Sequence, residues 1–226
     1  MVVPEYKKKL QYRFNQAQDG YDKHCSVQDR VCTAALTLLT SYRTVFASIA
    51  DLACGTGNST QQLLRMLSYE RLYALDFSES LLKQARQKLP KTIPLILADF
   101  DYPILAPACV DLLFCNMGCQ WSVHLGETLK TWRTSLQNEG WLLFSMPITP
   151  NFPELKPHSK WPTWSQMKTL IQQAGFRSIA TLPMSIRRCV RLKKQEPIIQ
   201  QLLPWQAQGF LAASFAAIFL IQNNHN

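Results

Sequence analysis

The 226-residue sequence has no apolar run long enough to cross a membrane as a helix. The longest run, FLAASFAAIFLI at 210–221, has about a dozen residues, whereas a spanning helix needs roughly 20. We interpret this run as a buried strand. The first residues, MVVPEYKKKLQYRF, include basic side chains but no following apolar segment of the kind found in secretory signals. We therefore expect a cytoplasmic protein with no membrane partner.

Paired cysteines and clustered histidines are also missing. The seven cysteines form no CxxC pair, which argues against a disulfide scaffold and fits a reducing compartment. The four histidines, His24, His124, His158 and His225, are scattered, and no spacing of ligands supports a metal site. We predict no bound metal and no histidine-based catalytic dyad.

The positive charge is concentrated in the last third of the chain. Of the formal net charge of +9, residues 1–155 contribute +1 from 15 basic and 14 acidic residues, and residues 156–226 contribute +8 from nine basic residues and Glu196. Such a surface is either simply solvated or suited to an acidic partner.

Helix-like and strand-like stretches alternate along the chain, and hydrophobic residues make up 47% of it. This length and composition suit a single domain with a sizeable core. The alternation predicts an α/β fold, in which a mostly parallel seven-stranded sheet carries helices on both faces. The expected helices are 5–18, 26–41, 58–68, 78–89, 124–137 and 163–174, and the expected strands are 45–51, 71–76, 93–98, 109–116, 140–147, 176–190 and 209–221.

A glycine-containing turn joins a strand to a helix in IADLACGTGNSTQQLL, residues 49–64. Gly55 and Gly57 allow a ligand to approach the backbone at a helix N-terminus, beyond the carboxyl end of a parallel strand. Asp76 ends the next strand, 19 residues after Gly57, where a carboxylate can accept hydrogen bonds from both hydroxyls of a ribose. Asp99 ends the third strand, which favours a nucleotide-like ligand.

The motifs DLACGTG, ALDFSESLL, LADFDYP and CVDLLFCN together resemble the class I S-adenosylmethionine-dependent methyltransferases over residues 45–146. The resemblance implies a Rossmann-like fold that binds S-adenosylmethionine and releases S-adenosylhomocysteine. It implies that Asp76 binds the ribose. Gln28 either reaches the amino-acid end of the cofactor or is a surface residue of an amphipathic helix. The other implied cofactor contacts are Asp51, Ala53, Gly55 and Gly57 around the methionine part, Asp99 and Phe100 beside the adenine, and Phe77 and Asn116. Asp51 as a helix-capping acid and Asp99 as a turn residue are the alternatives.

Two further segments resemble the malonyl-acyl carrier protein O-methyltransferases of biotin synthesis. These are QYRFNQAQDGYDKHCSVQDRVCTAAL and CNMGCQWSVHLGETLKTWRTSLQNEGWLLFSMPITPNFPELK, and they extend the likeness to about residues 11–175. The resemblance implies that Tyr21, Gln120 and Trp121 line the methyl-transfer channel and that the substrate is a thioester of acyl carrier protein or coenzyme A. A Gln-Trp pair is also found in methyltransferases acting on aconitate, and Trp121 could instead be a packing residue.

The resemblance also suggests how the chain is divided. Residues 1–44 would form an N-terminal helical lid, 45–146 the cofactor-binding core, and 147–226 a substrate cover with the last strands. The chain departs from the family where Asn138, Glu139 and Gly140 replace a Pro-Gly-Gly turn, and beyond residue 176 it does not align with the family's pattern.

A carboxylate substrate makes modest chemical demands, because with a pKa near about 4 it is already ionised at neutral pH and needs no general base. The basic segment IRRCVRLKK could serve such a substrate in two ways. Its side chains could dock an acidic carrier protein, or one arginine could clamp the malonyl carboxylate. The residues concerned are Arg187, Arg188, Arg191, Lys193 and Lys194.

Other functions are less consistent with the sequence. Methyltransferases that act on exocyclic amines often carry an Asn-Pro-Pro-aromatic motif, but here Asn116 precedes Met117, Gly118 and Cys119. The basic last third lacks the interleaved aromatic residues of a known nucleic-acid-binding module, so we expect no nucleic-acid partner. A non-catalytic cofactor-binding protein is the third alternative, and the sequence does not indicate an oligomeric state.

Overall fold

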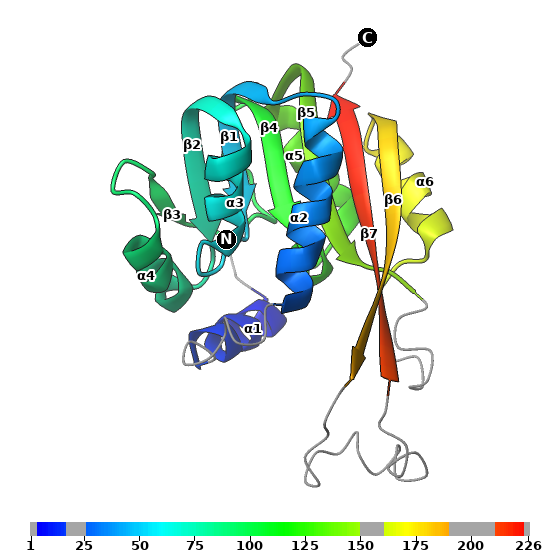
Figure 1. Cartoon of the computed structure of the whole chain (residues 1–226), viewed down its shortest axis with the longest axis horizontal. Coiled ribbons are helices and arrows are strands. Elements are labelled where there is room, and N and C mark those ends of the chain that lie inside the picture. The colour runs from blue at the N-terminus through cyan, green and yellow to red at the C-terminus, as the bar shows by residue number, and fades with distance from the viewer. Residues whose placement is uncertain (1–3, 17–25, 150–160, 190–210, 224–226) are drawn as a thin grey trace, which may run out of the picture.

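The computed structural model describes residues 4–16, 26–149, 161–189 and 211–223. Figure 1 shows one twisted sheet with helices packed on both of its faces. The helices are α1 (Glu5–Gln16), α2 (Ser26–Thr40), α3 (Asn58–Met66), α4 (Glu79–Lys88), the short 3₁₀ helix η2 (Cys119–Trp121), α5 (Leu125–Ser135) and α6 (Trp164–Gln173). The strands are β1 (Val45–Leu52), β2 (Ser68–Asp76), β3 (Leu95–Leu97), β4 (Val110–Asn116), β5 (Leu136–Pro147), β6 (Phe176–Cys189) and β7 (Leu211–Asn223).

The strands form a seven-stranded sheet in the order β3-β2-β1-β4-β5-β7-β6. The first five are parallel to one another, and β7 runs antiparallel between β5 and β6. This confirms the predicted α/β architecture with a mostly parallel sheet. The strand order reverses between β1 and β4, so the carboxyl ends of these two strands mark the point where open α/β sheets bind ligands.

Alternating side chains of the central strands supply two separate hydrophobic cores. Ile49 and Phe114 face α2, α3 and α4, whereas Ala50 and Leu113 face α5 and α6. Strands that are buried on both faces need apolar side chains at nearly every position, as VDLLFCN of β4 has. The predicted helices on both faces are therefore confirmed.

The two N-terminal helices lie in different places. α2 packs on the sheet, where Val31, Leu36 and Leu39 have no exposed surface, so it is part of the core. α1 instead lies beyond the carboxyl ends of the parallel strands (Figure 1). The start of α2 also reaches this edge, where Gln28 and Asp29 line the cavity described below.

Several boundaries differ from the sequence-based prediction. β2 begins at Ser68 rather than at 71, and β5 begins at Leu136 rather than at 140. Leu136 pairs with Val110 and is fully buried, so the chain enters the sheet directly after α5. The Nδ2 group of Asn223 donates to the carbonyl oxygens of Leu136 and Gln137 at 3.1 and 3.0 Å, which ties this early segment to β7.

The part of the long apolar run that lies in β7 is confirmed as a strand, and its last four residues are buried. Residues 218–221 of β7 have no exposed surface and pair with β5 on one side and β6 on the other. No helix in the described part of the chain combines the length and the apolar character that crossing a membrane requires.

Candidate functional site

A cavity of about 710 Å³, part of it open to solvent, lies at the carboxyl ends of the parallel strands. Eight of the predicted site residues line it: Gln28, Ala53, Gly55, Asp76, Phe77, Phe100, Asn116 and Trp121. The sequence did not point to the others, which are Lys7, Phe14, Asp29, Cys54, Thr56, Asn58, Ser59, Leu81, Met117 and Gly118.

Asp76 at the end of β2 holds the glycine turn in place. Its carboxylate accepts hydrogen bonds from the backbone N–H groups of Gly55, at 2.9 Å, and Ser78, at 2.8 Å. Only 4% of the residue is exposed, and this burial raises the pKa of Asp76 to about 6 although the backbone N–H groups oppose the shift. Each carboxylate oxygen has a further lone pair, so the hydroxyls of a ligand can still bind here.

Asp51 lies behind the turn, completely buried. Its Oδ2 accepts hydrogen bonds from the hydroxyls of Ser59, at 2.8 Å, and Thr60, at 2.6 Å. Burial raises the pKa of Asp51 to about 7, and the charge of Asp76 adds to the shift while the two hydroxyls oppose it. Asp51 does not line the cavity, but its partner Ser59 does. Its bonds run to side chains of α3 and not to backbone N–H groups, so it is not a conventional helix cap.

Gln28 places an unsatisfied acceptor at the cavity wall. Its Oε1 is buried and has no hydrogen-bond partner among the described residues, and the same is true of Asp51 Oδ1. The backbone at Gln28 is fixed, because Asn116 Nδ2 donates to its carbonyl at 3.0 Å and the hydroxyl of Ser145 donates to Asn116 Oδ1 at 2.8 Å. Buried acceptors without donors are costly in a folded protein, so Gln28 at the cavity wall fits a ligand with an ammonium group, as S-adenosylmethionine has.

Two turns of the cavity wall, after β1 and after β4, have strained backbone conformations and pack against each other. Ala53 after β1 and Met117 after β4 have positive φ angles of 59° and 52°. Such a conformation costs a residue other than glycine about 1–3 kcal/mol and is typical of functional sites. The two turns can touch because Gly118 has no side chain: a Cβ there would lie 2.7 Å from Ala53 Cβ and Cys115 Sγ.

Gly57, expected beside the methionine part of the cofactor, is not among the residues that line the cavity. It has a φ of 88° at the start of α3, and a Cβ there would come within 3.0 Å of Leu89 and 3.3 Å of Ala85. Glycine is therefore required at this position so that α3 can begin close to the end of α4.

The expected adenine end holds a lysine that the sequence did not reveal. Lys7 Nζ lies 3.0 Å from Asp99 Oδ1 and 4.8 Å from the centroid of the Phe100 ring. Asp99 is outside the cavity lining, whereas Lys7 and Phe100 are part of it. Because Lys7 and Asp99 are 92 residues apart, nothing in the local pattern of KKK could signal the pair.

The predicted transfer channel is partly described. Trp121 lines the cavity and packs edge-on against Phe14 at 5.6 Å between ring centroids. Gln120 is not part of the lining: its Nε2 donates to the carbonyl of Met117 at 2.6 Å, so it supports the turn that carries Met117. Tyr21 lies outside the described residues.

The predicted basic docking residues are only partly described. Arg187 and Arg188 belong to β6, but their side chains lie outside the described part of the structure. Arg191, Lys193 and Lys194 also fall outside it. Among the described residues there is no group of three potential metal ligands.

Comparison with known proteins identifies relatives of the core. The model of a methyltransferase domain matches residues 50–144. A malonyl-[acyl-carrier protein] O-methyltransferase 2 of Coxiella burnetii is 40% identical over 179 residues, which are 78% of this chain and 72% of that protein. A malonyl-[acyl-carrier protein] O-methyltransferase of Bacillus cereus is 33% identical over 65% of this chain and 55% of its own length. A trans-aconitate 2-methyltransferase of an Acidovorax species is 39% identical over 50% of this chain and 45% of its own. The chain thus spans about half the length of the last two relatives.

Solved structures share the fold at low sequence identity. The 1,6-didemethyltoxoflavin-N1-methyltransferase of Burkholderia thailandensis, with S-adenosylhomocysteine bound, has a TM-score of 0.68 and 14% identity, and the match covers 100% of this chain and 92% of that one. A phosphoethanolamine N-methyltransferase 2 of Haemonchus contortus, also with S-adenosylhomocysteine, has a TM-score of 0.61 and 12% identity over 85% of this chain and 53% of that one.

Proposed function

The chain belongs to the class I S-adenosylmethionine-dependent methyltransferases, and we propose that its cavity binds S-adenosylmethionine and that the enzyme methylates a carboxylate. The observation that carries this proposal is the cavity wall at the ends of the first four strands. This wall combines a glycine turn, Asp76 at the position expected for a ribose-binding carboxylate, and the buried Gln28 Oε1, which accepts no hydrogen bond from the described residues.

Each described residue has a distinct part in the proposed cofactor site. Asp76 accepts the ribose hydroxyls, and Gln28 accepts from the ammonium group at the other end. Phe77 and Phe100 offer ring faces for the adenine. Asp51 keeps the start of α3 in position through Ser59 and Thr60.

The chemistry requires positioning more than acid-base catalysis. The bound cofactor supplies an electrophilic methyl group on a positively charged sulfur. The acceptor carboxylate is ionised at neutral pH and can attack without a base. The protein's contribution is to orient the two groups and exclude water, and the aromatic wall of Phe14 and Trp121 serves that purpose. No histidine lines the cavity in the described part of the chain.

For the acceptor, we propose malonyl attached to acyl carrier protein or to coenzyme A, with its methyl ester as the product and an early step of biotin synthesis as the role. The 40% identity to the Coxiella burnetii enzyme supports this choice, as does the segment that contains Gln120 and Trp121. The basic residues Arg187, Arg188, Arg191, Lys193 and Lys194 would dock the acidic carrier or clamp the malonyl carboxylate. A small acid such as aconitate is the second candidate, because the Acidovorax relative is 39% identical over its matched part.

The test offers malonyl-acyl carrier protein, malonyl-coenzyme A and trans-aconitate side by side with methyl-labelled S-adenosylmethionine. We expect label in a methyl ester of the malonyl thioesters. Cofactor without an acceptor is the control, since it measures hydrolysis. Label in aconitate alone would replace the proposed substrate by the second candidate, and binding of the cofactor without transfer to any acid would refute carboxylate methylation.

A further inference from the structure

One lysine of α1 is buried while its neighbours are exposed. Lys7 is 2% exposed, whereas Lys8 and Lys9 lie on the outer side of the helix. Lysine is almost never fully buried unless its charge is paired. Its position is therefore determined by the groups around its ammonium.

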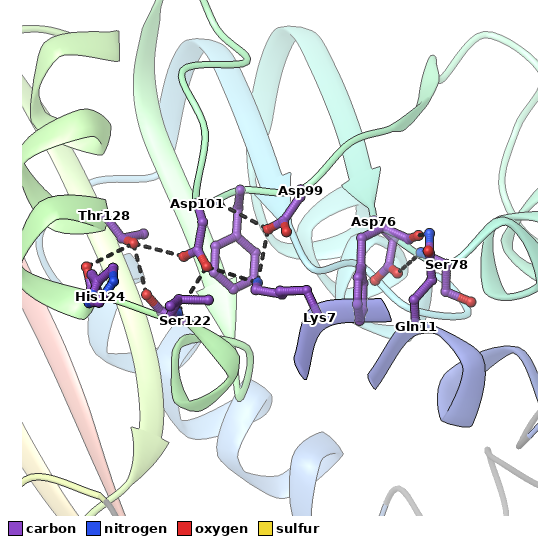
Figure 2. A network of polar contacts seen from close by, with 12 residues as sticks. Lys7, Gln11, Asp76, Ser78, Asp99, Asp101, Ser122, His124 and Thr128 are labelled. Carbon is purple, nitrogen blue, oxygen red and sulfur yellow. Dashed lines mark hydrogen bonds and ion pairs between the residues drawn. The ribbon is translucent and has the colours of Figure 1, made fainter. Parts of the chain in front are cut away.

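The ammonium of Lys7 joins two carboxylates from the segment after β3. Nζ lies 3.0 Å from Asp99 Oδ1 and 2.9 Å from Asp101 Oδ2. Figure 2 shows Lys7 reaching between these two acids from α1. The rings of Phe100 and Phe77 lie 4.8 and 5.7 Å from Nζ, within the range of a cation–π contact.

Asp101 also binds the segment that follows Trp121. Its Oδ2 accepts the backbone N–H of Val123 at 2.9 Å, and its Oδ1 accepts the hydroxyl of Thr128 at 2.8 Å. Burial alone would raise the pKa of Asp101, but the hydrogen bonds and the charge of Lys7 lower it. Asp101 is therefore a carboxylate at neutral pH, bonded on one side to α1 and on the other to the start of α5 (Figure 2).

Other contacts of α1 reach the segment after β2 and the ring of Trp121. Gln11 Nε2 donates to the carbonyl of Phe77 at 2.5 Å, and Asn15 Oδ1 accepts from the hydroxyl of Ser78 at 2.7 Å. Phe14 packs edge-on against Phe77 and Trp121. A helix of 12 residues has little stability of its own in water, so such contacts decide whether α1 stays in place.

We propose that Lys7 is a positioning residue that fastens α1 over the adenine end of the cofactor site and, through Asp101, aligns the segment carrying Trp121 with it. This inference rests on the proposed cofactor site. In the described contacts, Lys7 and the N–H of Asp101 both use Oδ1 of Asp99. Lys7 and Phe100 both line the cavity at its proposed adenine end, so the lysine and the cofactor would close the same wall together.

The test compares Lys7→Met with Lys8→Met, which removes the same charge from the exposed side of the same helix. Two quantities are measured: the Kd for S-adenosylhomocysteine by calorimetry, and the rate at which a protease cleaves within α1 of the empty protein. We expect about a tenfold or larger increase in Kd and faster cleavage in Lys7→Met, because breaking a buried ion pair leaves uncompensated charge. Lys8→Met should match the parent protein in both.

A double-mutant cycle with Asp101→Asn tests the path through Asp101. If Lys7 acts through this acid, Lys7→Met should raise the Kd by a smaller factor in the Asp101→Asn background than in the parent. Equal factors in the two backgrounds would contradict the path, and a lysine needed only for folding would lower Tm without this coupling.

Tighter binding of S-adenosylhomocysteine by Lys7→Met would overturn the proposal, because Lys7 would then compete with the adenine. An unchanged Kd and cleavage rate would overturn it as well. If the parent protein bound no S-adenosylhomocysteine, the proposed function would fail, whereas the cleavage rates would still show whether Lys7 fastens α1.

Discussion

At the scale of residues, two buried carboxylates are the main feature of the site. Asp51 and Asp76 are buried, and burial raises their pKa values from 3.8 to about 7 and about 6. Asp76 lines the cavity, and a raised pKa in a cavity is typical of a functional position. A positively charged ligand would favour the ionised forms, so ligand binding and proton release are coupled here.

The coupling predicts opposite effects of pH on binding and on stability. As the pH falls from about 7.5 to about 5.5, both acids become protonated, so S-adenosylmethionine should bind about fivefold or more weakly. Between their unfolded value of 3.8 and folded values of about 6 and 7, the folded protein holds more protons than the unfolded chain. The contribution of these acids to stability is therefore full below about pH 4 and is lost as the pH rises through the folded values.

Calorimetry and thermal unfolding at matched pH values check both directions. Asp51→Asn should flatten the pH dependence of Tm, because it removes the larger of the two shifts. A Kd that stays constant down to about pH 5.5 would show that neither acid is linked to the ligand.

At the scale of elements, the site depends on the close approach of two turns, after β1 and after β4. Gly118→Ala would place a Cβ 2.7 Å from Ala53 Cβ and Cys115 Sγ. Because backbone and buried side chains surround it, we expect a loss of about 1–3 kcal/mol in the free energy of unfolding and weaker cofactor binding. Denaturant unfolding and calorimetry measure the two effects.

Gly126→Ala in α5 is the matched control. A Cβ there meets only Leu170 Cδ2 at 3.4 Å, an ordinary contact, and alanine is the better helix former by roughly 0.5–1 kcal/mol. This variant should be as stable as the parent or more so. If Gly118→Ala were as stable as Gly126→Ala, the turns would tolerate a side chain at Gly118 and this prediction would be wrong.

The strand and helix pattern was readable because its signals are local. VDLLFCN is apolar at nearly every position, and Thr163 begins α6 with a capping box formed with Gln166. The start of β5 was missed because its pairing depends on Asn223, which is distant in sequence. The same limit hid Lys7, because its partners Asp99 and Asp101 lie more than 90 residues later in the sequence, after β3.

At the scale of the whole molecule, the fold brings four strand ends to one edge and places α1 across it (Figure 1). The order of acids along the sequence, Asp51, Asp76 and Asp99, was sufficient to predict that edge. Which of them contact the cavity was not predictable, because it depends on side-chain direction: Asp76 lines the cavity, Asp51 accepts from Ser59 of α3, and Asp99 binds Lys7.

The most direct test of the account is a calorimetric titration of S-adenosylmethionine into the parent protein and Asp76→Asn, with Glu79→Gln on the exposed side of α4 as the control for lost charge. We predict one site in the parent, unchanged in Glu79→Gln, and binding weaker by about tenfold to a hundredfold in Asp76→Asn, since a hydrogen bond to a charged group contributes about 1.5–3 kcal/mol. A folded parent protein that binds no cofactor, or an Asp76→Asn variant with unchanged affinity, would contradict the assignment of this cavity.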